Sequence, residues 1–374
     1  MKVITQICTQ ELSYPFPYPK EEMIFFDIET TGFSPKTSAL YLIGALYYKD
    51  NTWQLIQWFA DDTTSESKML TAFFNFLKSF SYLIHFNGTT FDIPFLTKKC
   101  IAHHLDSHLF SLEDCKSIDL YQQISPHKKR LQIPNLKQKT LEKFLNISRE
   151  DTYSGKELIN FYQNYRKALL QKDFEDAQEL EHFLLLHNHD DVLGMLQFSM
   201  LLYLSDLLNG SFTFETFSME QQNTIFIFHG TLPFTMPNAY CWKGDTIFLT
   251  VEANSLTCII SAYDTELKYF YDNPKEYYYL PAEDMAVHKS VATYVDKEFR
   301  LKATKATCYT RQTGLFLPAF SKDFPTVFRE NYEAKEYFLL CNVDFLSDTD
   351  QQQIYIKDLL KHCPDLVLSP MVST

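Results

Sequence analysis

An apolar run that ends in two acidic residues constrains this chain more than any other feature. Residues 23–32 read Met-Ile-Phe-Phe-Asp-Ile-Glu-Thr-Thr-Gly, with Asp27 and Glu29 two positions apart. Side chains alternate across a β-strand, so both carboxylates share one face while Phe26 and Ile28 point into a hydrophobic layer. Like charges this close resist ionising unless a cation neutralises them, and carboxylate oxygens suit Mg²⁺ or Mn²⁺. The run therefore predicts a strand that carries a metal site.

A second acidic segment follows at residues 82–96. Its pattern predicts a short strand, a turn at Asn87-Gly88, and a helix that begins near Phe91 or Asp92. An acid in the first turn of a helix is favoured by the helix dipole. We therefore expect the Asp92 carboxylate at a helix N-terminus, close to the end of a strand.

A third acidic segment lies in the apolar helix predicted over residues 183–193. His187 and Asp191 are four positions apart and so share one helix face. Burying unpaired acids in such a helix costs several kcal/mol, which predicts a metal or a basic partner nearby. An imidazole beside a carboxylate is suited to water activation, although a lone His in an apolar helix can also be a core residue. Asp190 is interpreted as a solvated or supporting neighbour.

Together, the order Asp-x-Glu, Asn-Gly-x-x-Phe-Asp and His-x-x-x-Asp-Val resembles that of the DEDD exonucleases of the ribonuclease H-like superfamily. Residues 136–142, Leu-Lys-x-x-x-Leu-Glu, are similar to a stretch in a branch of predicted bacterial nucleases, and the resemblance covers about residues 20–208. It implies a metal-dependent 3′–5′ exonuclease that hydrolyses single-stranded DNA or RNA by a two-metal mechanism. The implied ligands of the two divalent cations, Mg²⁺ or Mn²⁺, are Asp27, Glu29, Asp92 and Asp191.

Residue 187 departs from the family pattern. The four-residue spacing to Asp191 is that of a subgroup with Tyr at this position, yet this chain has His187. The reference pKa of about 6.5 for His suits a base near neutral pH, so His187 is a candidate catalytic base. A substitution that has drifted is the other interpretation, and it leads to the alternative function of a retired nuclease fold that binds nucleic acid or supports an assembly. An endonuclease of junctions or hybrids is a third reading.

Four further residues are candidate substrate contacts. In the family pattern, Asn87 and Phe91 lie against the terminal nucleotide, where an aromatic ring can stack on a base. The hydroxyls of Thr30 and Thr31 could reach a phosphate, and a tight turn explains them equally well. Phe91 is equally a core candidate and Asn87 a turn residue.

The order of elements predicts an α/β fold, a ribonuclease H-like mixed five-stranded sheet flanked by helices. From Asn209-Gly210 onward, β-favouring runs predict a second, α+β or β-rich domain, closed by a helix near residues 348–362. We expect domains 1–209 and 210–374. The second carries no recognisable catalytic motif.

The formal net charge of −13 disfavours broad binding to phosphates. Two local basic stretches could compensate. One comprises residues 127–130 with Lys137, Lys139 and Lys143, and reads either as a phosphate track or as a solvated face. The other, residues 286–311, mixes bases with aromatics as single-strand binders do, and a solvated helix face is the competing reading.

Cysteine usage and hydropathy bear on the compartment. Eight cysteines occur singly, without Cys-x-x-Cys, which indicates reduced thiols instead of a zinc or disulfide framework. No apolar run of about 18 residues is evident. We therefore expect a cytoplasmic protein without a membrane span. Protein partners are not indicated.

Overall fold

The computed structural model describes residues 1–62, 64–236, 238–363, 366–367 and 369–370. The chain forms two compact units: unit 1 is residues 1–129 with 133–205, and unit 2 is residues 206–374 with 130–132. The expected domain border between residues 209 and 210 stays a prediction. Each unit is considered by itself below.

Unit 1 is built on a mixed sheet. Its strands are β1 (Lys2–Cys8), β2 (Met23–Thr30), β3 (Leu40–Lys49), β4 (Thr52–Phe59), β5 (Tyr82–His85) and β6 (Lys116–Asp119). They lie in the order β1-β4-β3-β2-β5-β6, with β5 parallel to both β2 and β6 and the other pairs antiparallel. The predicted ribonuclease H-like sheet is confirmed.

The sheet has six strands where five were expected. The additional strand β1 pairs with β4 at the sheet edge, from Lys2↔Phe59 to Cys8↔Trp53. Its sequence, Lys-Val-Ile-Thr-Gln-Ile-Cys, is rich in β-branched residues although most of its side chains are exposed. This strand signal was missed in the sequence.

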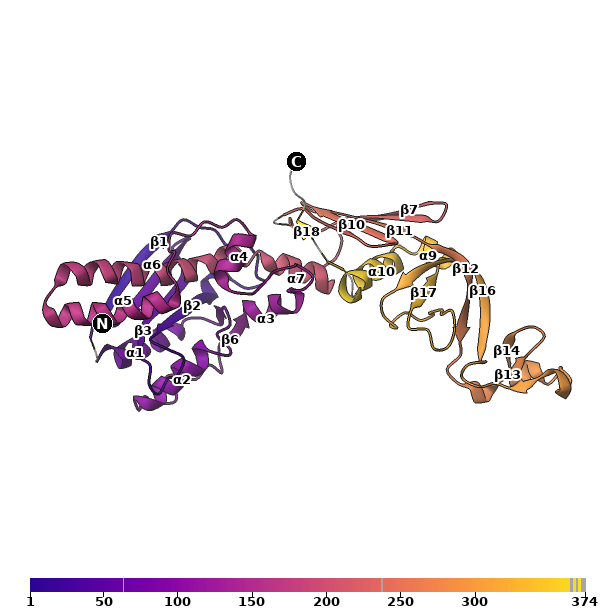
Figure 1. Ribbon diagram of the computed structural model, residues 1–374, viewed down its shortest axis with the longest axis horizontal. Coiled ribbons are helices and arrows are strands. Elements are labelled where there is room, and N and C mark those ends of the chain that lie inside the picture. The colour runs from indigo at the N-terminus through magenta and orange to yellow at the C-terminus, as the bar shows by residue number, and fades with distance from the viewer. Residues whose placement is uncertain (63, 237, 364–365, 368, 371–374) are drawn as a thin grey trace. The chain divides into compact units, whose positions relative to one another are not determined.

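Helices cover both faces of the sheet (Figure 1). The helical elements of unit 1 are η1 (Lys20–Glu22), α1 (Ser65–Leu77), α2 (Asp92–Ala102), α3 (Leu120–Ile124), η2 (Ser125–His127), α4 (Gln138–Phe144), α5 (Gly155–Gln171) and α6 (Phe174–Phe198). Helix α7 (Leu201–Asn209) runs from unit 1 into unit 2. Helices α1 and α2 pack on one face, and α5 and α6 on the other, around one continuous core.

Unit 2 is rich in β-structure, as expected. Its strands are β7 (Thr216–Gln222), β8 (Ile225–Thr231), β9 (Tyr240–Lys243), β10 (Ile247–Glu252), β11 (Ser255–Ser261), β12 (Tyr263–Phe270), β13 (Tyr277–Leu280), β14 (Met285–His288), β15 (Leu301–Lys302), β16 (Tyr309–Ala319), β17 (Tyr337–Leu340) and β18 (Ser369–Pro370). Its helical elements are η3 (Pro274–Glu276), α8 (Lys289–Ala292), η4 (Lys297–Phe299), α9 (Val343–Ser347) and α10 (Thr349–His362). The strands form sheets in the orders β18-β9-β10-β11-β8-β7, β12-β16-β17 and β14-β13-β15.

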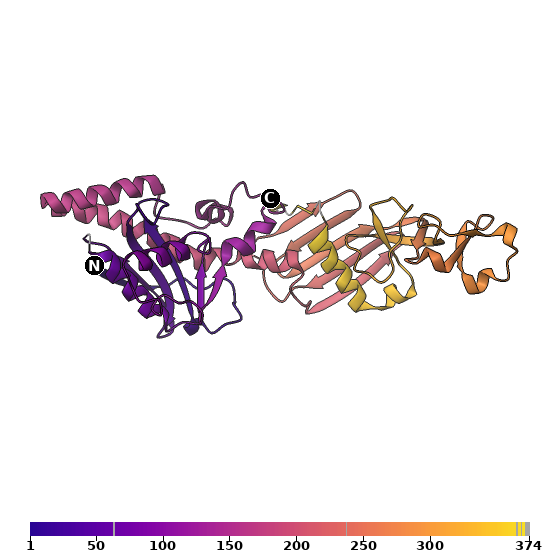
Figure 2. The same ribbon diagram turned by 90° about the horizontal axis from the view of Figure 1, so that it is seen from below.

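Helix α10 closes the core of unit 2. Figure 2 shows it lying across the sheet that contains β8, β10 and β11. The buried ring of Tyr355 contacts Phe228 of β8 with ring centroids 5.9 Å apart. The predicted closing helix and the α+β character of this half are thus confirmed.

One helical stretch corrects an expectation from the sequence. By length and composition alone, Phe174–Asn209, which contains α6 and α7, could cross a membrane. The protein buries 72% of its most apolar window, which is also the property of a core helix. The expected absence of a membrane span therefore stays a prediction.

The cysteines at positions 8, 100, 115, 241, 258, 308 and 341 have free thiols. Burial raises the pKa of Cys100 to about 12. The sequence likewise predicts reduced thiols at these positions. A cytoplasmic location stays a prediction.

Candidate functional site

Strand β2 presents its acids on the face that α6 covers. Phe26 points to the opposite face, where its ring lies 5.4 Å from that of Phe73 in α1. Asp27 instead accepts a hydrogen bond from Asn188 of α6. The alternation expected for residues 26–29 is therefore present, and it follows from the pleat of a strand.

Helix α6 comes close to the sheet because Gly44 of β3 lies opposite Asp27 in the strand register. A Cβ atom on Gly44 would lie 2.0 Å from the side-chain oxygen of Asn188. The Asn188 Nδ2 donates to Asp27 Oδ2 over 3.1 Å, and Gln57 Nε2 donates to Asn188 Oδ1 over 2.9 Å. Two side-chain amides therefore hold the Asp27 carboxylate in one orientation.

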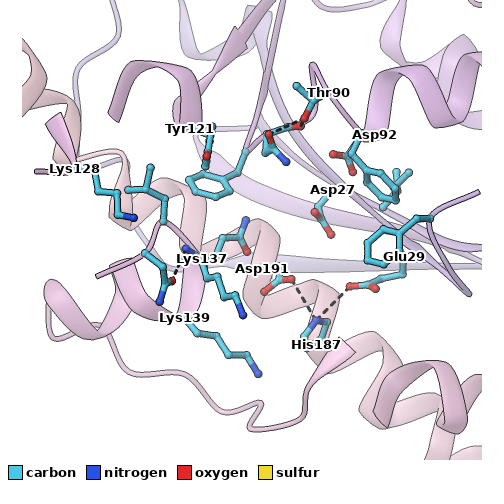
Figure 3. Close-up of a pocket in the computed structure, with 18 residues that line it drawn as sticks. Asp27, Glu29, Thr90, Asp92, Tyr121, Lys128, Lys137, Lys139, His187 and Asp191 are labelled. Carbon is cyan, nitrogen blue, oxygen red and sulfur yellow. Dashed lines mark hydrogen bonds and ion pairs between the residues drawn. The ribbon is translucent and has the colours of Figure 1, made fainter. Parts of the chain in front are cut away.

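The predicted acids and the imidazole meet in one cleft of about 920 Å³. Its lining includes Asp27, Glu29, Asp92, His187 and Asp191. In Figure 3 the four carboxylates face a shared space, with the imidazole beside two of them. Asp92 is the first residue of α2 and is 6% exposed. The structure thus brings together residues from β2, α2 and α6.

Crowding changes the proton affinity of these carboxyls. Burial raises the pKa of Glu29 to about 7 and that of Asp92 to about 7. Burial, followed by the charges of Asp92, Asp191 and Glu29, raises the pKa of Asp27 well above its usual value. Such a set is stable in ionised form only with added positive charge, and its oxygen donors are those that Mg²⁺ and Mn²⁺ prefer. The residues present therefore fit divalent cations.

Without metal, the folded protein should lose stability as the pH rises from about 4 to about 7. Unfolded carboxyls titrate near pH 4, whereas Glu29 and Asp92 keep their protons to a pKa of about 7. The folded state then binds more protons than the unfolded state, so the free energy of unfolding falls with pH, by up to about 1.4 kcal/mol per pH unit and group.

Thermal unfolding in EDTA between about pH 4.5 and 7.5 measures this effect. His85 acts in the opposite sense, because burial lowers its pKa to about 4. The comparison is therefore with Asp92→Asn, in which one raised carboxyl no longer titrates. The variant should gain stability relative to the wild type as the pH rises, and parallel curves would contradict the assignment.

His187 is held at the edge of the acid cluster by a buried carboxylate. Its Nδ1 lies 2.6 Å from Asp151 Oδ2, while its Nε2 lies 3.4 Å from Glu29 Oε1 and 3.3 Å from Asp191 Oδ2. The Asp151 side chain is fully buried. Burial by itself would raise the pKa of Asp151, but His187 and the hydrogen bonds around the carboxylate lower it to about 2. An ionised Asp151 favours a proton on Nδ1 and turns Nε2 towards the cleft.

Arg149 links the acids behind the cleft. Its guanidinium lies 2.5 Å from Asp191 Oδ1, 3.1 Å from Glu142 Oε1 and 3.0 Å from Asp151 Oδ2. The Arg149 side chain is only 8% exposed, so these contacts are little screened by solvent. Burial opposes its charge, yet Asp191 and the other acids raise the pKa of Arg149 further.

Sequence reasoning missed Arg149, Asp151 and Gln57. The first two lie in a loop with no spacing relation to His187, so no local pattern indicates them. Gln57 had a faint signal, because alternation in β4 places it with Trp53 and Leu55 on the buried side.

Asp190 supports the loop that contains Asp151. It was expected as a solvated or supporting residue, and its Oδ2 accepts the backbone N–H groups of Glu150 and Asp151 over 3.0 and 2.8 Å. Asp190 therefore fixes the position of the carboxylate that holds His187.

The predicted basic cluster divides into two parts. Lys128, Lys137 and Lys139 line the cleft, and in Figure 3 they lie on the side away from Asp92. Lys139 Nζ also lies 3.1 Å from Asp151 Oδ2. Arg130 instead belongs to unit 2, where it donates to the carbonyl oxygen of Leu360 over 2.8 Å and caps the end of α10. The cluster is therefore not one continuous track.

Asn87 lines the cleft from a turn. Its φ of 63° is left-handed, and its side-chain oxygen accepts from Thr90 Oγ1 over 2.8 Å. Asp119 accepts the Asn87 N–H over 2.8 Å and also caps α3 through the N–H of Tyr121 over 3.0 Å. Asp119 is thus the N-cap of α3, and the same carboxylate fixes the Asn87 turn.

Aromatic side chains also line the cleft. Phe33 and Phe91 both line the cleft, and their ring centroids are 6.0 Å apart. Phe91 is half-buried, whereas Phe33 is 91% exposed. Thr30 and Thr31 do not line it within the described part of the chain. Thr30 Oγ1 donates to Gly32 O over 2.9 Å, and Thr31 Oγ1 accepts the Ala39 N–H over 2.8 Å. Their hydroxyls therefore brace the loop that carries Phe33.

Residues 24–203 match the family model of the RNase H superfamily. No curated protein matches the sequence. Among solved structures, the chain is similar to a family B DNA polymerase from the archaeon Pyrobaculum calidifontis (13% identity, TM-score 0.41, 72% of this chain and 39% of the polymerase). It is also similar to exonuclease I (13%, TM-score 0.31, 62% and 55%) and to the metal-free E. coli ExoI–ssDNA complex (18%, TM-score 0.26, 34% and 35%).

These structural likenesses are weak. The matched region spans less than two thirds of each of those chains. All three TM-scores lie below 0.5, so the likenesses carry no argument about activity. What this chain does is therefore inferred from the family match and from the residues of the cleft.

Proposed function

We propose that this chain is a metal-dependent 3′–5′ exonuclease of the DEDD type, a proposal that the match of residues 24–203 to the RNase H superfamily supports. Its substrate would be single-stranded DNA or RNA. The convergence of four carboxylates and one imidazole in a single cleft supports the proposal most. Buried acids that raise one another's pKa values destabilise a protein, so a cluster of them indicates a functional site.

We assign the four carboxylates as ligands of two divalent cations, Mg²⁺ or Mn²⁺. Bound ions would stabilise the negative charge that develops on the phosphate and on the leaving oxygen. His187 is assigned as a base and not as a ligand, because Mg²⁺ prefers oxygen donors. Its ring nitrogen nevertheless lies close to the set, since ligand atoms of Glu29, His187 and Asp191 are within 4.8 Å of one another.

In the proposed reaction, His187 Nε2 takes the proton of the attacking water. The water oxygen bonds to phosphorus, and the bond from phosphorus to the 3′ oxygen of the preceding nucleotide breaks. The departing 3′ oxygen takes a proton from solvent, so the products are a nucleoside 5′-monophosphate and a strand with a new 3′-hydroxyl. Asp151 would hold the imidazole with Nδ1 protonated, so that Nε2 is free to accept the proton.

The remaining lining residues would position the strand. Lys128 and Lys137 offer positive charge to phosphates. Phe33 and Phe91 offer rings on which bases can stack, worth about 1–3 kcal/mol per base. Asn87 offers a polar contact beside them.

Replacing Lys128 and Lys137 by Ala should raise the KM for oligonucleotides roughly tenfold and change kcat little. The lysines would contact substrate through charge alone, so each loss should also lower the slope of log affinity against log salt by about 0.7. Steady-state kinetics at several salt concentrations measures both effects. Lys78→Ala, an exposed lysine outside the cleft lining, is the control. An unchanged salt slope would remove these lysines from the substrate path.

End-labelled substrates test the activity itself. With Mg²⁺, a 5′-labelled single strand should give a descending ladder, and a 3′-labelled strand should release labelled mononucleotide at once. A circular single strand should resist digestion. Cleavage of the circle would instead indicate an endonuclease, and digestion of neither form would reject the proposal. Parallel DNA and RNA strands identify the preferred sugar.

Arg149 favours a second candidate function, a retired nuclease fold that binds nucleic acid without cutting it. Its guanidinium contacts Asp191 at 2.5 Å and so supplies positive charge to a carboxylate that a metal would need. Calorimetric titration with Mn²⁺ separates the two functions. A retired site should bind Mn²⁺ no better than the Asp27→Asn variant does, whereas an active site should bind it more tightly.

A further inference from the structure

Unit 2 contains a small three-stranded sheet inserted between two paired strands. Strands β12 and β16 pair from Tyr263↔Phe316 to Phe270↔Tyr309, so residues 271–308 form an insertion at the end of this ladder. The insertion holds β13, β14 and β15 with the short α8 and η4. Figure 1 shows it at the end of the long β12–β16 pair, away from the β7–β11 sheet of the same unit.

The insertion exposes large apolar side chains. The solvated helix face considered for residues 286–311 was wrong, because the longest helix there is the four-residue α8. Tyr294 is 91% exposed, and Val291, Phe299 and Leu301 are 55–57% exposed. Single exposed apolar residues are common, but four within a short segment mark an interaction surface. We call these four side chains, with Lys297 and Lys302, the tip surface.

The tip surface is positively charged. Residues 288–305 contain five lysines and arginines and two acids, a net charge of +3 in a chain of −13. Lys297, Lys302 and Lys305 are exposed and, among the described residues, have no carboxylate within 4.0 Å. Their charge is therefore available to an anionic partner.

Two of the six acids in residues 271–308 are paired with neighbouring side chains. Glu276 lies 3.3 Å from Lys289. Asp284 accepts the hydroxyls of Tyr279 and Tyr309 over 2.5 Å each and lies 3.8 Å from Arg311. Glu276 and Asp284 are therefore engaged by partners other than Lys297 and Lys302.

We propose that the tip surface binds single-stranded nucleic acid. Exposed aromatic rings stack on bases of any sequence, and unpaired lysines replace the counterions of phosphates. The rest of the chain is acidic, so a polyanion would be directed to this basic region. A membrane surface fits less well, because no amphipathic helix longer than α8 is present in the described part of the insertion. The inference goes beyond the proposed hydrolysis, since the tip surface contains none of the cleft residues.

Fluorescence anisotropy with a labelled oligothymidylate in EDTA tests the proposal without hydrolysis. Tyr294→Ser with Phe299→Ser should weaken binding about tenfold, as expected for the loss of base stacking. Lys297→Glu with Lys302→Glu should weaken it to a similar degree and lower the salt slope. The matched controls are Val343→Ser and Lys243→Glu, two exposed positions of unit 2 outside the insertion, and they should bind as the wild type does.

Each outcome decides between partners. Wild-type affinity in both double variants would overturn the proposal. Loss of binding to vesicles containing phosphatidylserine, with oligothymidylate binding intact, would overturn it in favour of a lipid surface. All four changed side chains are exposed, so each variant should fold as the wild type does. Circular dichroism melting checks this.

The test also separates this inference from the proposed nuclease function. Hydrolysis of the p-nitrophenyl ester of thymidine 5′-monophosphate needs only one nucleotide, so tip variants should cleave it at the wild-type rate. A wild type that cleaves neither ester nor oligonucleotide would reject the nuclease function. Anisotropy in EDTA would still decide whether the tip surface binds a strand.

Discussion

Asp27→Asn should reduce Mg²⁺-dependent digestion by about 10³-fold or more while stabilising the metal-free protein. Loss of one of the four carboxylates removes charge that would hold the cations, and about 4 kcal/mol of lost transition-state stabilisation corresponds to 10³ in rate. In the metal-free state, however, burial and the charges of Asp92, Asp191 and Glu29 disfavour an ionised Asp27. An amide of the same shape avoids that cost and still accepts the hydrogen bond from Asn188.

Two measurements on the same samples check this prediction. Digestion rates are taken with saturating Mg²⁺, and melting temperatures with EDTA and with Mg²⁺. In EDTA, we expect the free energy of unfolding of the variant to exceed that of the wild type by about 1–2 kcal/mol, so that it melts at a higher temperature. Mg²⁺ should stabilise the variant less than it stabilises the wild type. Asp50→Asn, in the exposed β3–β4 turn, is the control. Equal activity, or a lower melting temperature in EDTA, would contradict the metal site.

Opposite effects on activity and stability would identify the acid cluster as a functional feature. A structural ion pair loses stability when one partner is removed. A cluster retained for a cation gains stability in the cation's absence, because repulsion is relieved. The stabilising contacts of the cleft come instead from the neutral side chains behind it, because Gln57 holds Asn188 and Asn188 holds Asp27.

The parts of the site that local patterns encode could be predicted from the sequence. Alternation in a strand places Asp27 with Glu29, and the four-residue spacing in a helix places His187 with Asp191. Both rules act over a few residues, so one segment contains the whole signal. The meeting of these segments followed only from the resemblance to a known family, and the structure now brings them to one cleft.

The supporting residues could not be predicted, because their contacts join distant parts of the chain. Asp151 meets His187 across 36 residues, and Gln57 meets Asn188 across 131. A buried carboxylate in a loop has no periodic signature. Likewise, residues 127–130 read as one basic run, yet Lys128 faces the cleft and Arg130 caps α10. Side-chain direction in a loop depends on packing that composition does not record.

The fold shows the same division. Strand β2 and helix α6 have apolar patterns that indicate their type, whereas the edge strand β1 has mostly exposed side chains and was missed. In unit 2, residues 288–302 combine lysines with aromatics in a way that resembles a helix face. The structure instead divides them among α8, η4 and β15. Pairing with β13, not local propensity, determines the conformation of Leu301 and Lys302.

His187→Ala should lower kcat by about 10²–10⁴-fold with little change in KM, because a general base acts in the transition state and not in substrate binding. Asp151→Asn should lower kcat by about tenfold, since a neutral amide no longer stabilises the imidazolium that forms when His187 accepts a proton. The Asp151 carboxylate also contacts Arg149 and Lys139, so a purely structural role must be separated from positioning.

A double-mutant cycle makes that separation. If Asp151 acts through His187 alone, the variant with both His187→Ala and Asp151→Asn should be no slower than His187→Ala by itself, because the positioned group is already gone. If Asp151 instead serves the cleft by holding Arg149 and Lys139, the two losses should multiply, and the melting temperature should fall in proportion. Steady-state kinetics of the four proteins at saturating Mg²⁺ measures the coupling. If the two effects multiply, Asp151 does not act by positioning His187, and its role is structural.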